Sequence, residues 1–438
     1  MSHLRTLAPT QGPGSSRAAA SARARKPTRG SSPGTRKGTG VSPRDLALRS
    51  AASHACYNPP TLPDQVLIVA GEASADLHAA RALEELRRIR PGVRAFGVGG
   101  QRLRGAGLEA IAPAEEISVM GIAEVLPRLP RILSILRQLA TAAAERRPKA
   151  ALLVDLPDFN LRLAAKLKKL GIPVVYYVSP TIWAWRRGRA KKIARVVDRM
   201  LCILPFEPRF YEGTGVQARF VGHPFAERPM PEPKERYRRM LGLADGRTTV
   251  ALVPGSRPSE LRRILPPMLE AAERIRAVHP DVQFVVPVAP TLPKGAVEPY
   301  LAGHRTVEVR LVDGRTEEVV GASDAALVKS GTSTLETALM LRPMVVVYRL
   351  SWLSYLVGRL LVRIAHFALV NILAGRGIVP ELLQREASPE RMAAEIERLL
   401  GDREARDEQL AALRELRASL GEPGAPERVA QEVAGVMR

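Results

Sequence analysis

Two stretches decide the fold of this chain: Leu252-Val253-Pro254-Gly255-Ser256-Arg257 and, further along, Lys329-Ser330-Gly331-Thr332-Ser333-Thr334-Leu335-Glu336. Each is the end of an apolar strand, followed by a Gly, one or more hydroxyls and the start of a helix. A strand-to-helix turn offers backbone N–H groups that suit a diphosphate, and an Arg beside it adds a bidentate cation. Glu336, on the second helix, could hold ribose hydroxyls. The pair predicts a nucleotide-diphosphate site made by Gly255, Ser256, Arg257, Ser330, Gly331, Thr332 and Glu336.

Short apolar runs alternate with amphipathic helices on both sides of these stretches. The predicted strands are 65–70, 93–98, 150–154, 174–178, 249–253, 282–286, 307–311, 325–329 and 344–348. The predicted helices are 77–90, 132–146, 161–170, 264–278, 317–322 and 334–340, with more helix after 388. This alternation predicts parallel sheets with right-handed crossovers. We therefore expect an α/β protein with two doubly wound, Rossmann-like domains facing a cleft, with ligands outside the carboxyl ends of the strands.

The domain boundaries follow from composition. The 438 residues are enough for two ordinary domains, and 46% of them are hydrophobic. The first 62 residues are basic and rich in Ser, Gly, Pro and Ala, so a disordered tail (1–62) is expected. Four prolines within 222–233 predict a linker between a first domain (63–225) and a second domain (234–380).

The net charge of +22 could indicate a nucleic-acid partner, but much of the excess lies in the tail. A transit peptide, a polybasic arm and a translated upstream region without a role all remain open for that tail. It lacks the apolar core of a secretory signal. The only two cysteines, Cys56 and Cys202, indicate neither a disulfide framework nor a cysteine metal site.

In the first domain, carboxylates follow two predicted strands. The strand 150–154 ends at Asp155-Leu156-Pro157-Asp158, which could supply a general base. One of the two aspartates would instead cap the next helix; Asp158 is the better cap, which leaves Asp155 as the better base. Glu72, after the first strand, could hold a hydroxyl or act as a second acid/base group, while Ser74 would cap the helix.

Other segments admit more than one reading. Trp183, Trp185 and Arg186 could form a nucleic-acid platform, bind a phosphate-bearing ligand with an apolar part, or include at least one Trp packed in the core. His223, at the domain junction, could bind a phosphate or be structural. Gly97-Val98-Gly99-Gly100 has no acidic partner at the spacing of a dinucleotide site, so we expect a phosphate-free turn.

Two apolar stretches with interleaved arginines bear on membranes. The stretches 120–139 and 350–369 carry too many charges to span a bilayer. They could lie as helices in an anionic membrane interface or be buried core helices.

Together these motifs resemble the lipid-A-disaccharide synthase family, in order from about Val66 to about Gln384. The resemblance is carried by 71–76, 119–125, 155–160, 177–180, 183–185, 204–207, 254–257, 330–332 and 371–376. Ala75 stands where the family usually has Gly.

The resemblance implies a glycosyltransferase of the GT-B fold type whose last helices (381–438) pack back on the first domain. It implies transfer, with inversion, of 2,3-diacylglucosamine from its UDP ester to the 6-hydroxyl of 2,3-diacylglucosamine 1-phosphate (lipid X). It places the protein on the anionic cytoplasmic face of the bacterial inner membrane, without a cofactor, a metal or a nucleic-acid partner.

The resemblance also implies roles for individual residues. Asp155 would be the base and Arg257 would stabilise the leaving UDP. Asn371 would lie near the diphosphate or donor sugar. The residues expected to bind the acceptor and its acyl chains are Ser74, Met120, Gly121, Trp183, Trp185 and Arg186. The alternatives are another UDP-sugar enzyme of this fold (a lipid-linked N-acetylglucosaminyl transferase or an epimerase), a nucleic-acid-binding protein, and a lipid carrier.

Overall fold

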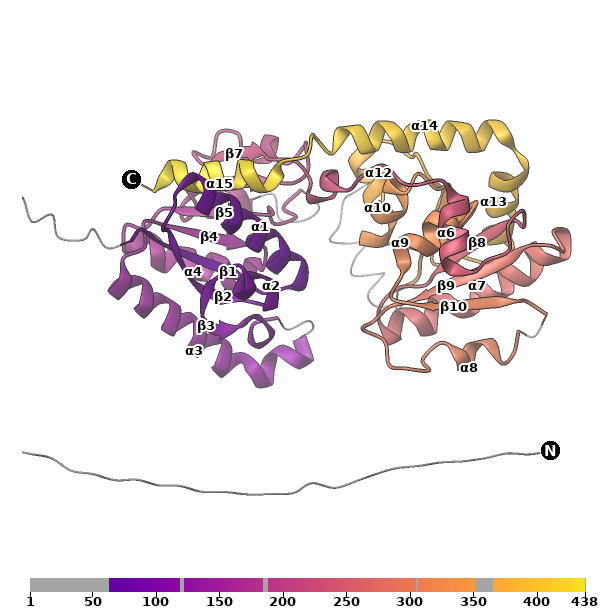
Figure 1. Cartoon of the computed structure of the whole chain (residues 1–438), viewed down its shortest axis with the longest axis horizontal. Helices are drawn as coiled ribbons and strands as arrows, with labels where there is room; N and C mark the ends of the chain where they lie inside the picture. Colours follow the sequence, from indigo (N-terminus) through magenta and orange to yellow (C-terminus); the bar gives the residue numbers. More distant parts are fainter. Residues whose placement is uncertain (1–62, 119–121, 184–187, 305, 351–364, 438) are drawn as a thin grey trace, which may run out of the picture. The chain divides into compact units, whose positions relative to one another are not determined.

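The computed structural model describes residues 63–118, 122–183, 188–304, 306–350 and 365–437. Within them the chain forms two α/β domains, each built on one parallel sheet (Figure 1). The first sheet has the strand order β3-β2-β1-β4-β5-β6-β7, and the second has the order β10-β9-β8-β11-β12-β13. The prediction of two doubly wound domains is confirmed.

The first domain contains the following strands and helices, in chain order: β1 (Gln65–Ala70), α1 (Ala73–Ile89), β2 (Arg94–Gly99), α2 (Gln101–Gly105), β3 (Leu108–Pro113), η1 (Ala114–Glu116), α3 (Ile122–Arg146), β4 (Ala150–Val154), α4 (Pro157–Lys169), β5 (Val174–Tyr177), α5 (Arg189–Ala194), β6 (Arg199–Cys202), η2 (Pro208–Tyr211) and β7 (Gln217–Phe220). The short helix η3 (Pro224–Glu227) lies in the predicted linker.

The second domain and the C-terminal segment contain α6 (Lys234–Leu241), β8 (Thr249–Val253), α7 (Pro258–Val278), β9 (Gln283–Val288), α8 (Glu298–Leu301), β10 (Val309–Asp313), α9 (Thr316–Ala322), β11 (Ala325–Lys329), α10 (Thr332–Leu339), β12 (Met344–Tyr348), α12 (Leu369–Ala374), β13 (Glu381–Leu383), α13 (Pro389–Gly401), α14 (Arg403–Ser419) and α15 (Ala425–Val436).

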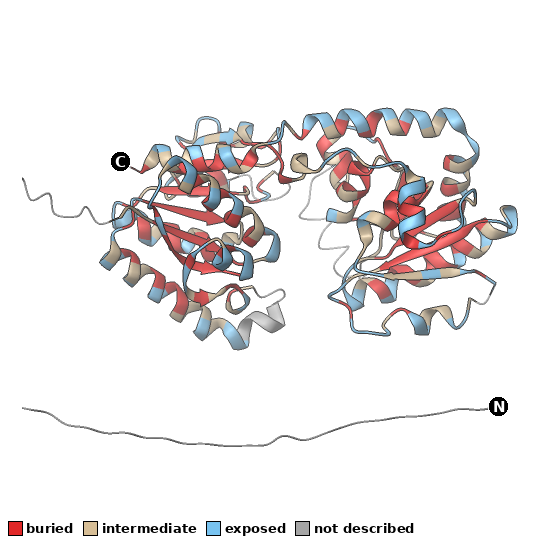
Figure 2. Cartoon of the chain, viewed as in Figure 1, coloured by how far each residue is buried: buried red, intermediate tan, exposed pale blue. Residues whose placement is uncertain are grey.

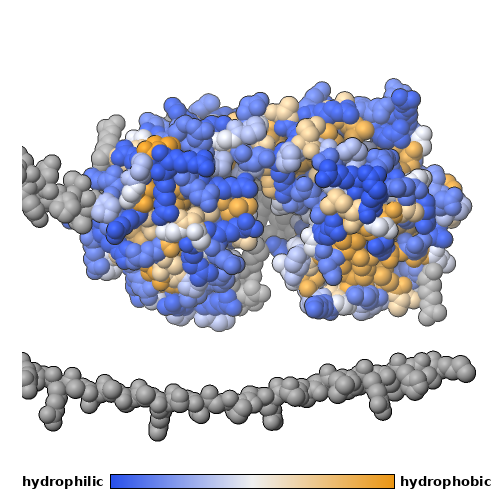
Figure 3. Space-filling view, viewed as in Figure 1, coloured by the Kyte–Doolittle hydropathy of each residue, from blue (hydrophilic) through white to orange (hydrophobic). Residues whose placement is uncertain are grey.

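The central strands are buried on both faces. Every residue of β4 and β8 is buried, because helices cover both sides of each sheet (Figure 2). This explains why these strands are continuous apolar runs in the sequence. On the face shown in Figure 3, hydrophilic residues predominate and hydrophobic ones gather in smaller patches.

The main differences from the predicted elements lie at helix starts and sheet edges. Helices α1, α4 and α7 begin directly after the polar turns, several residues earlier than predicted; α4 and α7 each begin with a Pro, a residue suited to the first helical position. The sequence analysis missed β3, β6, β7 and β13. Three of these are short or half exposed, so they lack the apolar run that marks a central strand.

The C-terminal segment divides between the two domains. Residues 381–438 were expected to be helices packed on the first domain. The segment instead begins with β13, which pairs with β12, and α13 packs against α7 while α14 packs against α10. Helix α15 packs on the first domain, where Val429, Ala430 and Val433 join the core beside α1.

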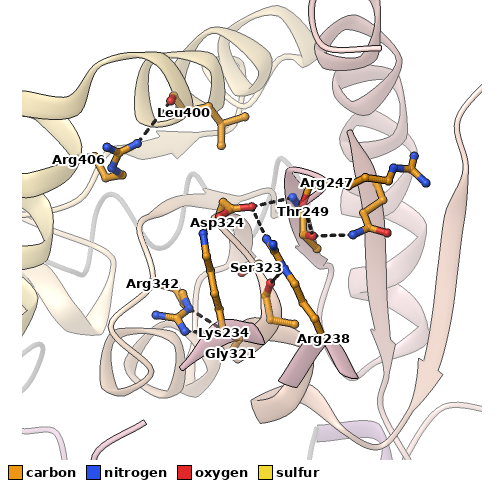
Figure 4. Close-up of polar contacts among 12 residues, drawn as sticks. Lys234, Arg238, Arg247, Thr249, Gly321, Ser323, Asp324, Arg342, Leu400 and Arg406 are labelled. Atoms are coloured by element: carbon orange, nitrogen blue, oxygen red, sulfur yellow. Dashed lines mark hydrogen bonds and ion pairs between the residues drawn. The ribbon is translucent and has the colours of Figure 1, made fainter. Parts of the chain in front are cut away.

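An ion-pair network closes the amino end of the second sheet (Figure 4). Asp324, just before β11, accepts hydrogen bonds from Lys234 (2.5 Å), Arg238 (2.6 Å) and the N–H of Thr249 (2.8 Å). Arg238 also donates to the carbonyl of Ala322 at 3.0 Å. The network ties α6 to two strands of the sheet, at the edge opposite their carboxyl ends.

A buried carboxylate explains the glycine-rich turn after β2. Asp76, on α1 and 5% exposed, accepts hydrogen bonds from the N–H groups of Gly100 (2.6 Å), Arg102 (3.0 Å) and Leu103 (3.2 Å). A carboxylate of the chain itself thus occupies the helix N-terminus where an anion would bind. The turn is therefore satisfied within the chain, in agreement with the expected phosphate-free turn.

We predict that Asp76→Ala lowers the free energy of unfolding by about 3 kcal/mol, because three buried N–H groups lose a charged acceptor. Thermal unfolding followed by circular dichroism measures the effect. Asp76→Asn should lose less, since one amide oxygen can still accept. Glu84→Ala, exposed on the same helix, is the control; an equal loss in that variant would contradict the assignment.

Candidate active site

The residues predicted for the base and for the diphosphate turns follow the strands that flank the point where the strand order reverses. In the first sheet β1 and β4 are neighbours, with Ala70 paired to Val154, so Gly71-Glu72 and Asp155 leave the sheet at the same level. In the second sheet β8 and β11 are neighbours, with Val253 paired to Val328. Ligands of doubly wound sheets bind at these reversal points.

Asp155 is held in a strained backbone conformation. Asp155 and Leu156 have φ of 52° and 48°, a left-handed region that non-glycine residues rarely adopt. The N–H of Asp155 donates to the carbonyl of Tyr177 at 2.9 Å, and its own carbonyl accepts from the buried Asn160 amide at 2.8 Å and from the Tyr176 hydroxyl. Neighbouring strand and helix residues therefore fix the position of this loop.

The environment of Asp155 suits a general base. Burial raises the pKa of its carboxyl, while a hydrogen bond from the backbone of Leu156 partly opposes the shift. A carboxylate with a raised pKa accepts a proton more readily near neutral pH than an exposed one does.

Asp158 differs from Asp155 in its surroundings. Its side chain is 89% exposed and pairs with Arg189 at 3.0 Å. The interpretation of Asp158 as the helix cap is wrong, because the N-cap of α4 is Leu156 and no side chain caps this end. The structure therefore distinguishes the two aspartates by burial rather than by capping.

Glu72 lies beside Asp155. It is the N-cap residue of α1, but no side chain caps that helix, so the interpretation of Ser74 as the cap is also wrong. Burial and then the Asp155 carboxylate raise the pKa of Glu72, while Arg257 lowers it. Ser74 is exposed in the first turn of α1, and Ala75 is buried there without strain. The structure thus brings two carboxyl groups together at the carboxyl edge of the first sheet.

At the Gly255 turn, a carboxylate of the chain occupies the place predicted for a phosphate. The N–H of Ser256 donates to Glu260 at 3.0 Å, and Glu260 pairs with Lys329 at 2.7 Å and with Arg257 at 3.9 Å. Gly255 has φ of +114°, and a Cβ there would lie 2.4 Å from a Glu260 oxygen. Burial opposes ionisation of Glu260, but Lys329 lowers its pKa on balance.

The sequence analysis missed Glu260 and Lys329 as site residues. The available signals were a carboxylate one helical turn after Gly-Ser-Arg and a cation at the end of a buried strand. Neither signal links the two residues, because they meet only when β8 and β11 pair.

The second predicted turn also lies at a helix start. Gly331 is the N-cap residue of α10, with φ of 154°, and Thr332 is exposed in the first turn. The hydroxyl of Ser330 donates to the carbonyl of Phe367 at 3.2 Å. Glu336 pairs with Arg228 of the linker at 3.4 Å, so a ribose at Glu336 would compete with this ion pair.

Asn371 is engaged by hydrogen bonds within the chain. Its amide nitrogen donates to the carbonyl of Val379 (2.9 Å) and to Glu381 (2.6 Å), and its oxygen accepts from the N–H groups of Ile378 and Val379. Glu381 in turn accepts from the N–H of Phe367 at 2.7 Å. Asn371 therefore holds the segment between α12 and β13, and its amide does not offer a donor to a sugar.

His223 is a neutral imidazole at the domain junction. Its Nδ1 accepts from the N–H of Phe225 at 3.1 Å, so the proton is on Nε2. Burial, followed by the effects of His78 and Arg228, lowers the pKa of His223 to about 4. The backbone N–H of His223 donates to the carbonyl of Leu420 at 2.8 Å, and this bond ties the junction to the segment before α15.

Among the expected acceptor residues, Trp183 packs in an apolar cluster. It lies edge-on to Phe206, with ring centroids 5.4 Å apart, as core packing predicts. Met120, Gly121, Trp185 and Arg186 lie outside the described residues. In α3, Ile135, Leu136 and Leu139 are buried in the first-domain core, and Leu133 packs against it. No helix among the described residues is long and apolar enough to cross a membrane.

Glu207 is a buried carboxyl next to this cluster. It is 2% exposed, accepts from the N–H of Leu204 at 3.1 Å, and burial raises its pKa to about 7. Below about pH 4.5 the carboxyl is protonated in both the folded and unfolded states. Between about pH 4.5 and pH 7 the Glu207 carboxyl ionises in the unfolded state but stays protonated in the folded state. The contribution of Glu207 to the free energy of unfolding therefore falls as the pH rises.

We predict that Glu207→Gln removes this pH dependence. The stability of the variant relative to wild type should rise by up to roughly 3 kcal/mol between pH 4.5 and pH 8, because glutamine cannot ionise. Urea denaturation at both pH values measures the change. The exposed Glu212→Gln is the matched control. A constant difference between wild type and Glu207→Gln across the range would refute the assignment.

Comparisons with known proteins agree with this geometry. A family model described as lipid-A-disaccharide synthetase matches residues 66–432. The lipid-A-disaccharide synthase of Anaeromyxobacter dehalogenans (strain 2CP-1) is 83% identical over 379 residues, which cover 86% of this chain and 99% of that protein. The one from Myxococcus xanthus is 55% identical over 374 residues, covering 85% and 97% of the two chains.

Solved structures of low identity share the fold. The glycotransferase of kitacinnamycin has a TM-score of 0.56 at 18% identity, covering 86% of this chain and 100% of that one. A UGT transferase from Siraitia grosvenorii, solved with UDP, has a TM-score of 0.55 at 14% identity, covering 85% and 100%. The fold is that of GT-B glycosyltransferases. The sequence matches show that this chain belongs to the lipid-A-disaccharide synthase family and is a glycosyltransferase of lipid A biosynthesis.

Proposed function

We propose that this protein transfers 2,3-diacylglucosamine from its UDP ester to the 6-hydroxyl of lipid X. The products would be the β-1,6-linked disaccharide 1-phosphate and UDP. The proposal rests on one observation above the others: carboxyl groups gather at the reversal point of the first sheet, and cations gather at that of the second. An inverting sugar transfer needs a base for the acceptor and positive charge for the leaving group.

Asp155 is the proposed base. Its carboxylate takes the proton of the 6-hydroxyl as the oxygen attacks the anomeric carbon from the face opposite UDP. The bond from that carbon to the phosphate oxygen breaks, and the electron pair leaves with UDP, so the configuration inverts. Glu72, whose pKa is raised partly by Asp155, is placed to hold a hydroxyl of the acceptor.

Arg257, Lys329 and the turns at Gly255-Ser256 and Ser330-Gly331-Thr332 are proposed to stabilise the departing UDP. Fixed cations and N–H dipoles stabilise charge that develops in a transition state. The donor diphosphate would take the N–H of Ser256 that Glu260 holds here, and Glu260 would keep its pair with Lys329. Glu336 is proposed to bind the ribose, and His223 to donate from Nε2 to a phosphate or substrate hydroxyl.

The acylated substrates require apolar surface near a membrane. We propose that the protein works at the anionic cytoplasmic face of the inner membrane, and that the segments around Met120-Gly121 and Trp183-Ala184-Trp185-Arg186, with Ser74, contact the acceptor. The scheme requires neither a cofactor, a metal nor a nucleic acid.

The test is UDP release by the purified full-length protein, given UDP-diacylglucosamine with and without lipid X. Release that depends on lipid X, with a disaccharide 1-phosphate detected by mass spectrometry, is the expected result. Turnover of unacylated UDP-N-acetylglucosamine instead would indicate another UDP-sugar enzyme of this fold. Saturable lipid binding without UDP release would indicate a lipid carrier.

A further inference from the structure

A basic basin lies on the second domain, outside the turns assigned to the donor. Its volume is about 600 Å³, and it opens between α7 and the residues that follow β12 and β13. The basin is lined by Arg262, Arg263, Pro266, Pro267, Glu270, Arg349, Leu350, Gln384, Arg385 and Pro389. Four guanidinium groups thus face one carboxylate within a single concave surface.

The fold builds this basin from three segments. Arg262 and Arg263 lie in the early turns of α7, Arg349 follows β12, and Arg385 follows β13. Strands β12 and β13 end together, with Tyr348 paired to Leu383, so the residues after them lie at the carboxyl edge of the sheet. The Gln384 amide joins the two segments, since its oxygen accepts from the N–H of Leu350 at 2.7 Å.

The arginines of the basin have few hydrogen-bond or ion-pair partners among the described residues. Arg349 donates through one Nη to the carbonyl of Ala387 at 2.5 Å, but its buried Nε has no hydrogen-bond partner within the described part of the chain. Burial lowers the pKa of Arg349, and only Glu270 opposes this. Arg262, Arg263 and Arg385 are exposed and form no hydrogen bond or ion pair with another described residue.

The contrast with Asp324 is informative. There, Lys234 and Arg238 share a carboxylate (Figure 4). In the basin, the buried Nε of Arg349 is left without an acceptor among the described residues, which is unfavourable unless a ligand accepts from it. Guanidinium forks match the oxygen geometry of phosphate and bind it in a bidentate manner.

We infer that this basin binds a phosphate group, as a monoester or diester, at a site separate from the donor diphosphate turn. A cavity of about 600 Å³ is larger than a phosphate ion needs and admits a phosphorylated head group. The phosphate could belong to a soluble compound or to a lipid.

The test compares the full-length protein with two double variants. Arg262→Ala/Arg385→Ala removes two exposed charges from the basin, and Arg239→Ala/Arg414→Ala removes two exposed, unpaired arginines elsewhere on the described surface. Both retain the basic tail, so the effect of the tail on binding cancels. One arm measures sedimentation with phosphatidylcholine vesicles containing phosphatidylglycerol, at 150 mM salt. The other measures thermal stabilisation by inorganic phosphate.

We expect the basin variant to bind one of these probes about thirtyfold more weakly than the control variant does. Each of the two arginines contributes roughly 1 kcal/mol near an anionic surface, and about 1.4 kcal/mol corresponds to a tenfold change in affinity. Weaker vesicle binding assigns the site to a lipid phosphate, and weaker stabilisation by inorganic phosphate assigns it to a soluble one. If both arms give equal results for the two variants, the basin is not a phosphate site. The inference does not depend on the proposed reaction.

Discussion

Asp155→Asn is expected to lower kcat by about three orders of magnitude while the protein stays folded. General-base catalysis contributes typically 10²- to 10⁴-fold, and an amide cannot take the proton of the acceptor hydroxyl. The substitution keeps the size of the side chain, and the loop is held mainly by backbone contacts to Tyr177, Asn160 and Tyr176. Rates of UDP release in the presence of lipid X measure the effect, and circular dichroism monitors the fold.

The matched control for this experiment is Asp158→Asn. Asp158 lies in the same loop region, but it is exposed and pairs with Arg189. Exposed ion pairs contribute little, so this variant should keep turnover within about twofold of wild type. Equal losses in both variants would show that the loop as a whole matters and that Asp155 is not the specific base.

The pH profile gives an independent check on Asp155. Because burial raises the pKa of its carboxyl, activity should fall as the pH drops through that raised value, when the base becomes protonated. Burial and then the Asp155 carboxylate raise the pKa of Glu72, so the two carboxyl groups lie close enough to interact. In Asp155→Asn the residual activity should lose most of the fall at low pH.

Arg257→Ala is expected to lower kcat by 10²- to 10³-fold, which corresponds to about 3–4 kcal/mol of lost transition-state stabilisation. Arg257 is the N-cap residue of α7, and the helix dipole and the Ser256 N–H at this end also favour negative charge. Removing this guanidinium should also take away one of the two cations that pair with Glu260, which would leave Lys329 as its ion-pair partner. Steady-state kinetics with both substrates separate the effects on kcat and KM.

Two variants calibrate the Arg257 result. Arg257→Lys keeps the charge but loses the bidentate fork, so it should recover only part of the rate. Arg274→Ala removes a similarly exposed arginine from the same helix, where it pairs with Glu390, and should leave turnover close to wild type. A wild-type kcat/KM for Arg257→Ala would remove this side chain from the mechanism.

Much of the candidate site could be selected from the sequence because its signals are local. Gly255-Ser256-Arg257, Ser330-Gly331-Thr332 and Asp155 all lie where a buried apolar run meets a helix, and each pattern occupies only a few consecutive residues. Strands β4, β8, β11 and β12 were predicted with the bounds that the structure has, or within a residue of them, since burial on both faces requires continuous apolar runs.

The interactions that the sequence analysis missed link residues far apart in the chain. Asp76 accepts hydrogen bonds at the N-terminus of α2, and Glu260 forms an ion pair with Lys329. The Asn371 amide forms hydrogen bonds with Glu381 and with the chain before β13. The apolar pattern of a strand shows that it is buried but does not show which strand lies next to it. In the same way, the residues around a polar side chain in the sequence do not show which distant residue it will pair with.

The sequence by itself therefore determined the two-domain α/β class, the turns and the carboxylate at strand ends, and the family resemblance. The tertiary structure alone decided that β1 lies next to β4 and β8 next to β11, that α15 packs against α1 of the first domain, and that Glu260 accepts the Ser256 N–H. The physical reason is that local periodicity sets the type and burial of an element, whereas the choice among its neighbours depends on packing and hydrogen bonding between distant segments.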